Sequence, residues 1–281
     1  MRNKIRSVFA FQIKLIRSSQ RIGLIFLLAA IFVASQLQGV LEFSRDVSIP
    51  VAPWAFPHIT SDYICQLVLM AGAVALFCDA PFHSDIQKYI LPRAGRVPWV
   101  AGQCMYIISL SFLYELMILL VSILCLLPDL EFRASWGKIW GTLARSVAGR
   151  QYGIPFTVND YLIGAYTPIQ ATLLSFLLSF GCCTWLGLLT YFLNSVTGGY
   201  AGTFVSAGFV LMDITVSNEW LPWFYRISPV TLAQLQALKG SNSRCQIGLN
   251  YALLFFGSSI ACLLLGSILA PKLDTLWRKR T

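Results

Sequence analysis

Long apolar runs are the feature that most constrains how this chain can fold. Several of them approach or exceed the roughly 20 residues needed to cross the hydrocarbon core of a bilayer. The first reads IGLIFLLAAIFVASQLQGV, from Ile22 to Val40. Since a backbone in lipid must satisfy its own hydrogen bonds, such runs predict helices. Only 12% of the residues are charged while 57% are hydrophobic, too few charges to coat a soluble domain. The sequence therefore predicts an all-α, polytopic integral membrane protein.

The apolar runs predict six membrane spans that form a single transmembrane domain over residues 1–281. The spans are expected at 22–40, 63–78, 98–127, 169–193, 199–216 and 247–269. The third is long enough to tilt or to project beyond the bilayer, and glycine interrupts the fifth. Loops are expected at 128–168 and 217–246, outside the cytoplasm.

The basic residues predict the orientation. Most of the 21 lysines and arginines lie before the first span, between the second and third spans, or after the last span. Cytoplasmic segments next to membrane spans are enriched in Lys and Arg. Both termini are therefore expected in the cytoplasm, and the chain is expected in the plasma membrane. Attraction of these residues to anionic lipid accounts for the net charge of +9, so no nucleic-acid partner is expected.

The first 21 residues predict an amphipathic helix at the membrane surface. Apolar residues at positions 5, 8, 9, 13 and 16 fall near one helical face, with basic residues between them. The alternative is a positively charged lead-in that only fixes the topology.

The stretch DAPFHSDIQKYILPRAGRVPWVAG, residues 79–102, predicts a short cytoplasmic helix at 82–91. Phe82, Ile86 and Tyr89 share one stripe, and Pro92 ends the helix. Pro98 suits the first turn of the next helix, with Trp99 expected at the depth of the membrane interface. A ten-residue helix is marginal in isolation. Either the lipid surface or a groove on another protein must therefore hold it.

No catalytic or metal-binding motif occurs in the sequence. The two histidines, His58 and His83, are expected on opposite sides of the membrane, and there is no GxSxG turn or GxxxxGK[ST] loop. The eight cysteines lie mostly in or beside spans and include no CxxC pair. The chain is therefore not expected to be an enzyme or to hold a cofactor of its own.

Polar residues within the predicted spans are the next candidates for function. Glu115 lies midway through the third span. It is a functional candidate because placing a charged carboxylate in hydrocarbon costs free energy. The alternative is a protonated glutamate with a structural role. Gln66, Thr203 and Ser206 could contact a substrate or could only join helices. Small residues at four-residue spacing, which allow close helix packing, are Ala71 and Ala75 in the second span and Gly198 and Gly202 near the start of the fifth.

Two segments resemble the bacterial ABC-2 type exporter permeases. They are YILPRAGRVPWVAGQ after the second span and WFYRISPVTLAQLQAL at 223–238. The six-span plan and the basic amphipathic N-terminal segment are also similar to those of this family. The resemblance implies a half-transporter. A second permease copy or a homologous permease would complete the membrane unit, and separate ABC ATP-binding subunits would hold ATP and Mg.

The resemblance also implies roles for particular segments. Residues 82–91 would be the coupling helix seated on the ATP-binding subunit, residues 1–21 a connector helix beside it, and residues 218–239 a short helical cap on the outer side. The second and fifth spans would line the export path and face the other permease. The residues implied in coupling are Phe82, Asp85, Ile86, Tyr89, Ile90, Arg93 and Arg96.

One departure from the simplest members of the family is the long outer loop at 128–168. It contains Trp136, Trp140, Arg145 and Arg150. It is expected to be either a substrate or partner surface, or an amphipathic helix lying on the membrane.

The expected function is the permease subunit of an ATP-driven exporter whose cargo is an amphipathic peptide, a lipid or a drug. A membrane assembly or sensor protein without transport is one alternative. A secondary transporter is another, but the two halves of the chain show no convincing inverted repeat.

Overall fold

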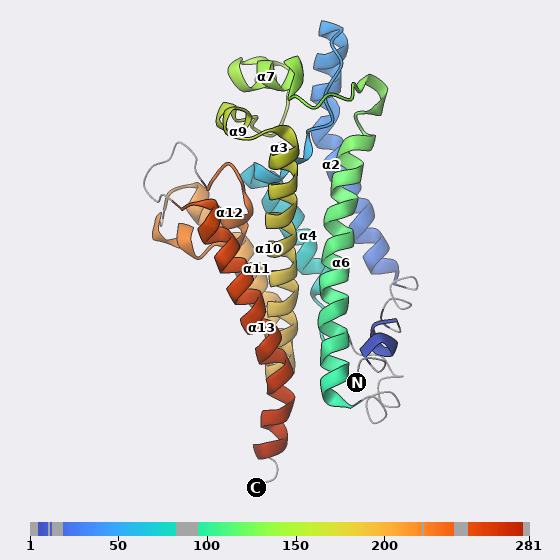
Figure 1. Cartoon of the computed structure of the whole chain (residues 1–281), viewed down its shortest axis with the longest axis vertical. Helices are drawn as coiled ribbons and strands as arrows, with labels where there is room; N and C mark the ends of the chain where they lie inside the picture. Colours follow the sequence, from blue (N-terminus) through green and yellow to red (C-terminus); the bar gives the residue numbers. More distant parts are fainter. Residues whose placement is uncertain are drawn as a thin grey trace.

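The computed structural model describes residues 5–10, 12, 19–82, 95–220, 222–238 and 247–277, and this part of the chain is all-α apart from one isolated bridge between Val51 and Leu130. Four helices are long and apolar enough to cross a membrane: α2 (Gln20–Val47), α6 (Arg96–Leu124), α10 (Pro168–Thr197) and α13 (Leu249–Trp277), the last with its apolar part at Leu249–Leu269. They confirm the all-α prediction and indicate a multi-pass membrane protein (Figure 1).

Two further apolar helices, α4 (Tyr63–Phe77) and α11 (Ala201–Ser217), lie in the same bundle. Their 15 and 17 residues correspond to about 22 and 26 Å of helix, less than the ~30 Å of bilayer hydrocarbon. The six helices coincide with the six predicted spans but end at other residues. α2, for example, continues past Val40 to Val47, because a helix can extend into polar surroundings that a hydropathy pattern does not detect.

Helix α10 occupies the centre of the bundle, in contact with α4, α6, α11 and α13 (Figure 1). Its small residues permit close packing. A Cβ atom at Gly187 would lie 2.7 Å from Ile107 Cγ2 and 2.8 Å from Phe77 Cδ2, so only glycine fits between α6 and α4 at this level. Large apolar side chains remain exposed on the outside of the bundle, as a lipid-facing surface requires. They include Leu27, Leu28 and Ile31 of α2, Leu173 and Leu177 of α10, and Leu254 and Leu265 of α13.

At one end of the bundle, the upper end in Figure 1, residues 127–166 fold into η1 (Leu127–Asp129), α7 (Gly137–Arg145), α8 (Ala148–Gln151) and α9 (Asp160–Ala165). Two tryptophans fix this outer segment from the inside. Trp140 Nε1 donates to the Ala52 carbonyl at 2.9 Å, and Trp136 Nε1 donates to the Tyr166 carbonyl at 3.0 Å. α7 is amphipathic as expected, but its buried face packs on the protein itself and both tryptophans are buried.

A short helix that the sequence reasoning missed, α3 (Phe56–Ser61), lies beneath this outer segment with every residue buried. His58 of α3 is in ring contact with both tryptophans, at centroid distances of 5.0 Å to Trp136 and 4.8 Å to Trp140. Burial lowers the pKa of His58 to about 3, so its imidazole is neutral at physiological pH.

Asp62 joins the outer segment to the bundle. It separates α3 from α4 and caps α4, since its Oδ1 accepts from the amides of Ile64 at 3.1 Å and Cys65 at 3.2 Å. Its Oδ2 accepts from the amide of Thr157 at 3.1 Å. One carboxylate therefore fixes both the start of α4 and a residue nearly a hundred positions later.

Segment 218–239, expected to form a short helical cap, contains η2 (Pro222–Arg226) and α12 (Pro229–Ala233) within its described part. It is joined to α11 through Asp213, whose carboxylate accepts from Thr231 Oγ1 and, at 3.0 Å, from Gln234 Nε2.

Candidate functional site

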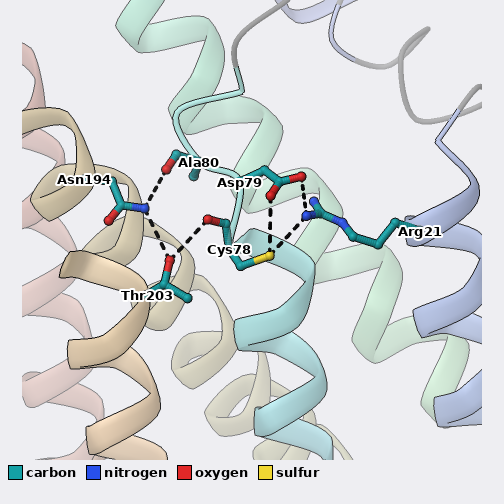
Figure 2. Close-up of polar contacts among 6 residues, drawn as sticks. All are labelled: Arg21, Cys78, Asp79, Ala80, Asn194 and Thr203. Atoms are coloured by element: carbon teal, nitrogen blue, oxygen red, sulfur yellow. Dashed lines mark hydrogen bonds and ion pairs between the residues drawn. The ribbon is translucent and has the colours of Figure 1, made fainter. Parts of the chain in front are cut away.

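The ends of four helices meet in the lower half of the bundle, on the same side as residues 5–10 and the C-terminal end of α13 (Figure 1). We call the polar contacts among them the lower junction, and Figure 2 shows its side chains. Its residues are Arg21 of α2, Cys78, Asp79 and Ala80 after α4, Asn194 of α10 and Thr203 of α11. The junction lies directly before residues 83–94, which include most of the predicted coupling helix.

Asn194 is the centre of the lower junction. Its side chain is only 2% exposed, and its Nδ2 donates to the Ala80 carbonyl at 2.7 Å. Its Oδ1 accepts from the amide of Gly202 at 2.7 Å. Since Asn194 is in the last turn of α10, one amide group holds the end of that helix to the segment after α4 and to the first turn of α11 (Figure 2).

Thr203 makes a second connection between α11 and the segment after α4. Its Oγ1 donates to the Cys78 carbonyl at 3.1 Å and accepts from Asn194 Nδ2 at 3.4 Å. The last carbonyls of a helix have no partner within the helix. Cys78 is the C-cap residue of α4, and its carbonyl accepts this hydrogen bond from Thr203, a side chain of a different helix.

Arg21 connects α2 to the same place. Its guanidinium forms an ion pair with Asp79 and donates to Cys78 Sγ at 3.0 Å (Figure 2). The Asp79 side chain is 60% exposed, and exposed ion pairs contribute only about 0–1 kcal/mol. We therefore assign the pair a positioning role more than a stabilising one.

Phe82, the first predicted coupling residue, lies in a turn and packs against α6. Its ring meets Tyr106 edge-on at a centroid distance of 4.9 Å, and its carbonyl accepts from Gln103 Nε2 at 3.4 Å. The chain is thus attached to α6 at the last described residue before the gap.

The other predicted coupling residues are only partly covered by the structure. Asp85, Ile86, Tyr89, Ile90 and Arg93 lie outside the described residues. Arg96 is the first residue of α6 and is exposed.

Trp99, expected at the depth of the membrane interface, is buried within the protein and only 5% exposed. An indole one turn into α6 is therefore part of the protein core at this end, so the start of α6 is held in place.

The described part of the N-terminal segment packs beside the start of α6. Residues 5–10 are helical, and Val8 is buried against Gly102. A Cβ atom at Gly102 would lie 2.5 Å from Val8 Cγ1, so the close approach requires glycine. The predicted amphipathic helix thus has one face on the protein.

The predicted polar candidates bond to neighbouring helices of the same chain. Gln66 Nε2 of α4 donates to Ser179 Oγ of α10 at 3.0 Å, and Ser206 of α11 is 2.7 Å from Thr190 Oγ1 of α10. Thr203 belongs to the lower junction. These contacts fit the interhelical role that the sequence left open beside substrate contact. Glu115 differs, because neither of its buried carboxyl oxygens has a hydrogen-bond partner among the residues that the structure describes.

The predicted small residues have three different environments. A Cβ atom at Gly202 would lie 2.5 Å from the Thr190 carbonyl oxygen, so α11 packs closely on α10 here. Gly198 does not belong to that stripe: it caps α10 in the left-handed conformation, with φ of 70°, before α11 begins. Ala71 and Ala75 are exposed on the outer face of α4.

Sequence reasoning missed Asn194, Arg21 and Asp79 as functional candidates. The available signals were weak: an amide in the last turn of an apolar run, an arginine directly before one run and an aspartate directly after another. Only the fold shows that these three positions adjoin.

Among the described residues, no group of three or more His, Cys, Asp or Glu side chains could hold a metal ion. The functional groups of the lower junction are amides, hydroxyls, carbonyls and one ion pair. Such groups can position and transmit movement.

Comparison with known proteins assigns no family to this chain. No family model, no curated protein and no solved structure matches it. The resemblance to exporter permeases therefore depends on the quoted sequence motifs.

Proposed function

We propose that this chain is the membrane-spanning permease subunit of an ATP-driven exporter of the ABC-2 type. In this proposal α2, α4, α6, α10, α11 and α13 are the six spans, the lower end faces the cytoplasm, and the chain is in the plasma membrane. Separate ATP-binding subunits supply the hydrolysis of ATP, and the cargo is an amphipathic peptide, a lipid or a drug.

The observation that carries the proposal is the attachment of both ends of segment 83–94 to the bundle. Before the segment, Ala80 is bonded to Asn194, Cys78 to Thr203, and Phe82 to α6. A movement of the segment would therefore pull on α4, α10, α11 and α6 together. A coupling element needs this arrangement, whereas a simple connecting loop does not.

The start of α6 supports the same reading. Trp99 is buried, and the adjoining turn contains Gly102, where Val8 packs. A force applied at Arg96 would thus act on a rigid helix and on the N-terminal segment, the element that the family resemblance places beside the ATP-binding subunit.

The exposed face of α4 is suited to a second permease. Ala71 and Ala75 lie on it with Ile64 and Val68, which are 49% and 38% exposed. Small side chains permit close helix association in lipid, where the hydrophobic effect gives little drive. A permease dimer packed along α4 would place the export path between the two copies.

The coupling role can be tested by site-specific crosslinking in native membranes. A photoreactive crosslinker attached to Tyr89→Cys, in a variant that lacks the eight native cysteines, should capture a nucleotide-binding protein, identified by mass spectrometry. The control is Lys138→Cys on α7, at the other end of the bundle, which should capture none.

A second measurement separates coupling from binding. Asn194→Ala should reduce export while the crosslink from Tyr89→Cys persists, because the docking segment is retained but its connection to α10 is lost. If Tyr89→Cys captures no nucleotide-binding protein in membranes that support export, the proposal is wrong.

A further inference from the structure

Glu115 lies near the middle of α6 and is completely buried, with 0% exposure. Neither Oε1 nor Oε2 has a hydrogen-bond partner in the part of the chain that the structure describes. Asp62 and Asp213, the other buried carboxylates in the described residues, each accept hydrogen bonds on both oxygens. Glu115 is thus the exception among the buried acids.

Among the described residues, no positive charge lies beside Glu115 to balance an ionised carboxylate. The titratable groups that interact with it are Tyr114 on α6 and Cys182 and Cys183 on α10, and Asp213 of α11 lies near Cys182. None of these groups is basic. Ser111, one turn earlier on α6, is also buried and lies beside Cys183.

The basic residues of the neighbouring helices lie elsewhere. α4, α10 and α11 contain no Lys, Arg or His. In α6 the only basic residue is Arg96 at its start, in α2 they are Arg21 and Arg45 near its ends, and in α13 it is Lys272 in the last turns. An ionised carboxylate at position 115 would be a buried charge without a partner, which costs several kcal/mol.

We infer that Glu115 is a proton-binding site whose occupancy keeps α6 packed against α10. Protonation removes the charge of the carboxyl, so the site needs neither a counter-ion nor a cavity to hold one. The resulting acid O–H can donate to the hydroxyl oxygen of Ser111 or to the sulfur of Cys183, which lie beside it. This inference does not depend on the exporter proposal.

The site links pH to the packing of these two helices. When α6 and α10 are together, the carboxyl is buried and holds its proton. When they separate and water reaches it, the carboxyl can ionise, and the proton passes to water. The separated form therefore binds fewer protons, so a rise in pH favours separation and acid favours the closed bundle.

The protonation state can be read directly by ¹³C NMR of purified protein labelled at the glutamate side-chain carboxyl. The chain has four glutamates: Glu42, Glu115, Glu131 and Glu219. Each signal is assigned by its absence from the spectrum of the matching Glu→Gln variant. If Glu115→Gln does not fold, its signal is still the one that remains after the other three are assigned.

The expected result is that the Glu115 signal has the chemical shift of a protonated acid at neutral pH. A Glu115 signal at the shift of an ionised carboxylate at neutral pH would overturn the inference.

The link to helix packing has its own measurement. The thermal midpoint of the wild type should fall as the pH is raised from about 7 to about 9, because the folded state retains a proton that the unfolded state has released. Glu115→Gln, which mimics the neutral acid, should lose this part of the dependence, whereas the exposed-site variant Glu42→Gln should keep it. Parallel curves for wild type and Glu115→Gln would refute the link.

Discussion

At Asn194, one amide side chain meets three segments of the chain. Its partners are the carbonyl of Ala80 and the amide of Gly202, with Thr203 beside it. All of these contacts are within the bundle, where an unpaired polar group costs about 1–3 kcal/mol. A large effect from a single substitution is therefore expected here.

Asn194→Ala should lower the free energy of unfolding by about 1–3 kcal/mol, because it leaves the Ala80 carbonyl and the Gly202 amide without partners. The measurement is the thermal midpoint of the purified protein in detergent. Asn218→Ala is the matched control: the Asn218 amide is exposed and bonds only to the Ile214 carbonyl of its own helix. Equal midpoints for the two variants would contradict the assigned role of Asn194.

His58 should make stability depend on pH in the acid range. Its pKa is about 3 in the folded protein and about 6.5 when exposed, so between these values the unfolded state binds more protons. The contribution of His58 to stability is therefore complete above about pH 6.5 and is lost progressively as the pH decreases. At pH 5 the loss is about 2 kcal/mol.

Thermal midpoints measured from about pH 7.5 to about pH 5 test this. His58→Gln should have a shallower acid slope than the wild type, and His83→Gln, which replaces the only other histidine, should keep the wild-type slope. An unchanged slope in His58→Gln would show that the imidazole is not buried as described.

At the scale of elements, close contacts between helices decide which substitutions can be accommodated. A Cβ atom at Gly202 would lie 2.5 Å from the Thr190 backbone oxygen, while nothing lies within 4 Å of one at Gly208 on the same helix. The two glycines therefore form a natural pair for comparison.

Gly202→Ala should destabilise the protein by about 1–3 kcal/mol, because α11 must move away from α10. Gly208→Ala should be neutral or stabilising by up to about 1 kcal/mol, since alanine favours the helix over glycine. Thermal midpoints of both variants test the pair. If Gly202→Ala is as stable as Gly208→Ala, α10 and α11 are not in contact at this point.

Asp62 should control how firmly the outer segment is held to the bundle. Asp62→Ala removes the cap of α4 and the acceptor of the Thr157 amide, at a cost of about 0.5–2 kcal/mol for the cap alone. Hydrogen exchange should become faster at the amides of Ile64, Cys65 and Thr157. In the control Asp160→Ala, which loses only an exposed pair with Arg145, exchange at these three amides should be unchanged.

The helices that span the bundle could be predicted from sequence because their apolar runs are long and continuous. The polar contacts could not. Asn194 and Ala80, for example, are 114 residues apart, and no local pattern pairs them. α3 was missed because six residues are too few to show a period. Gly198 was placed in the wrong helix because a glycine that ends one helix and a glycine that begins a packing stripe have the same local signature.

At the scale of the whole molecule, the six helices alternate in direction through the bundle (Figure 1). The ion pair of Arg21 with Asp79 joins the start of α2 to the end of α4, and that of Arg45 with Asp129 joins the end of α2 to the segment after α6. Residues 5–10, Arg96 and the end of α13 thus share the lower end, and α7 is at the upper end.

This arrangement predicts opposite accessibility for two cysteines engineered singly into a variant that lacks the eight native cysteines. Lys138→Cys on α7 should react with a membrane-impermeant maleimide added to intact cells. Arg96→Cys should react only after the membrane is permeabilised, in keeping with the excess of basic residues expected on the cytoplasmic side. Labelling of both variants in intact cells would rule out the proposed topology.

The central position of α10 also has a consequence for biosynthesis. Ribosomes make α4 and α6 before α10, so the surfaces of Phe77 and Ile107 that pack around Gly187 enter the membrane before their partner has been translated. Until residue 187 has been inserted, lipid or the insertion machinery must cover the surfaces of Phe77 and Ile107. A nascent chain halted before this point would therefore contain α4 and α6 already inserted in the membrane but not yet packed against α10.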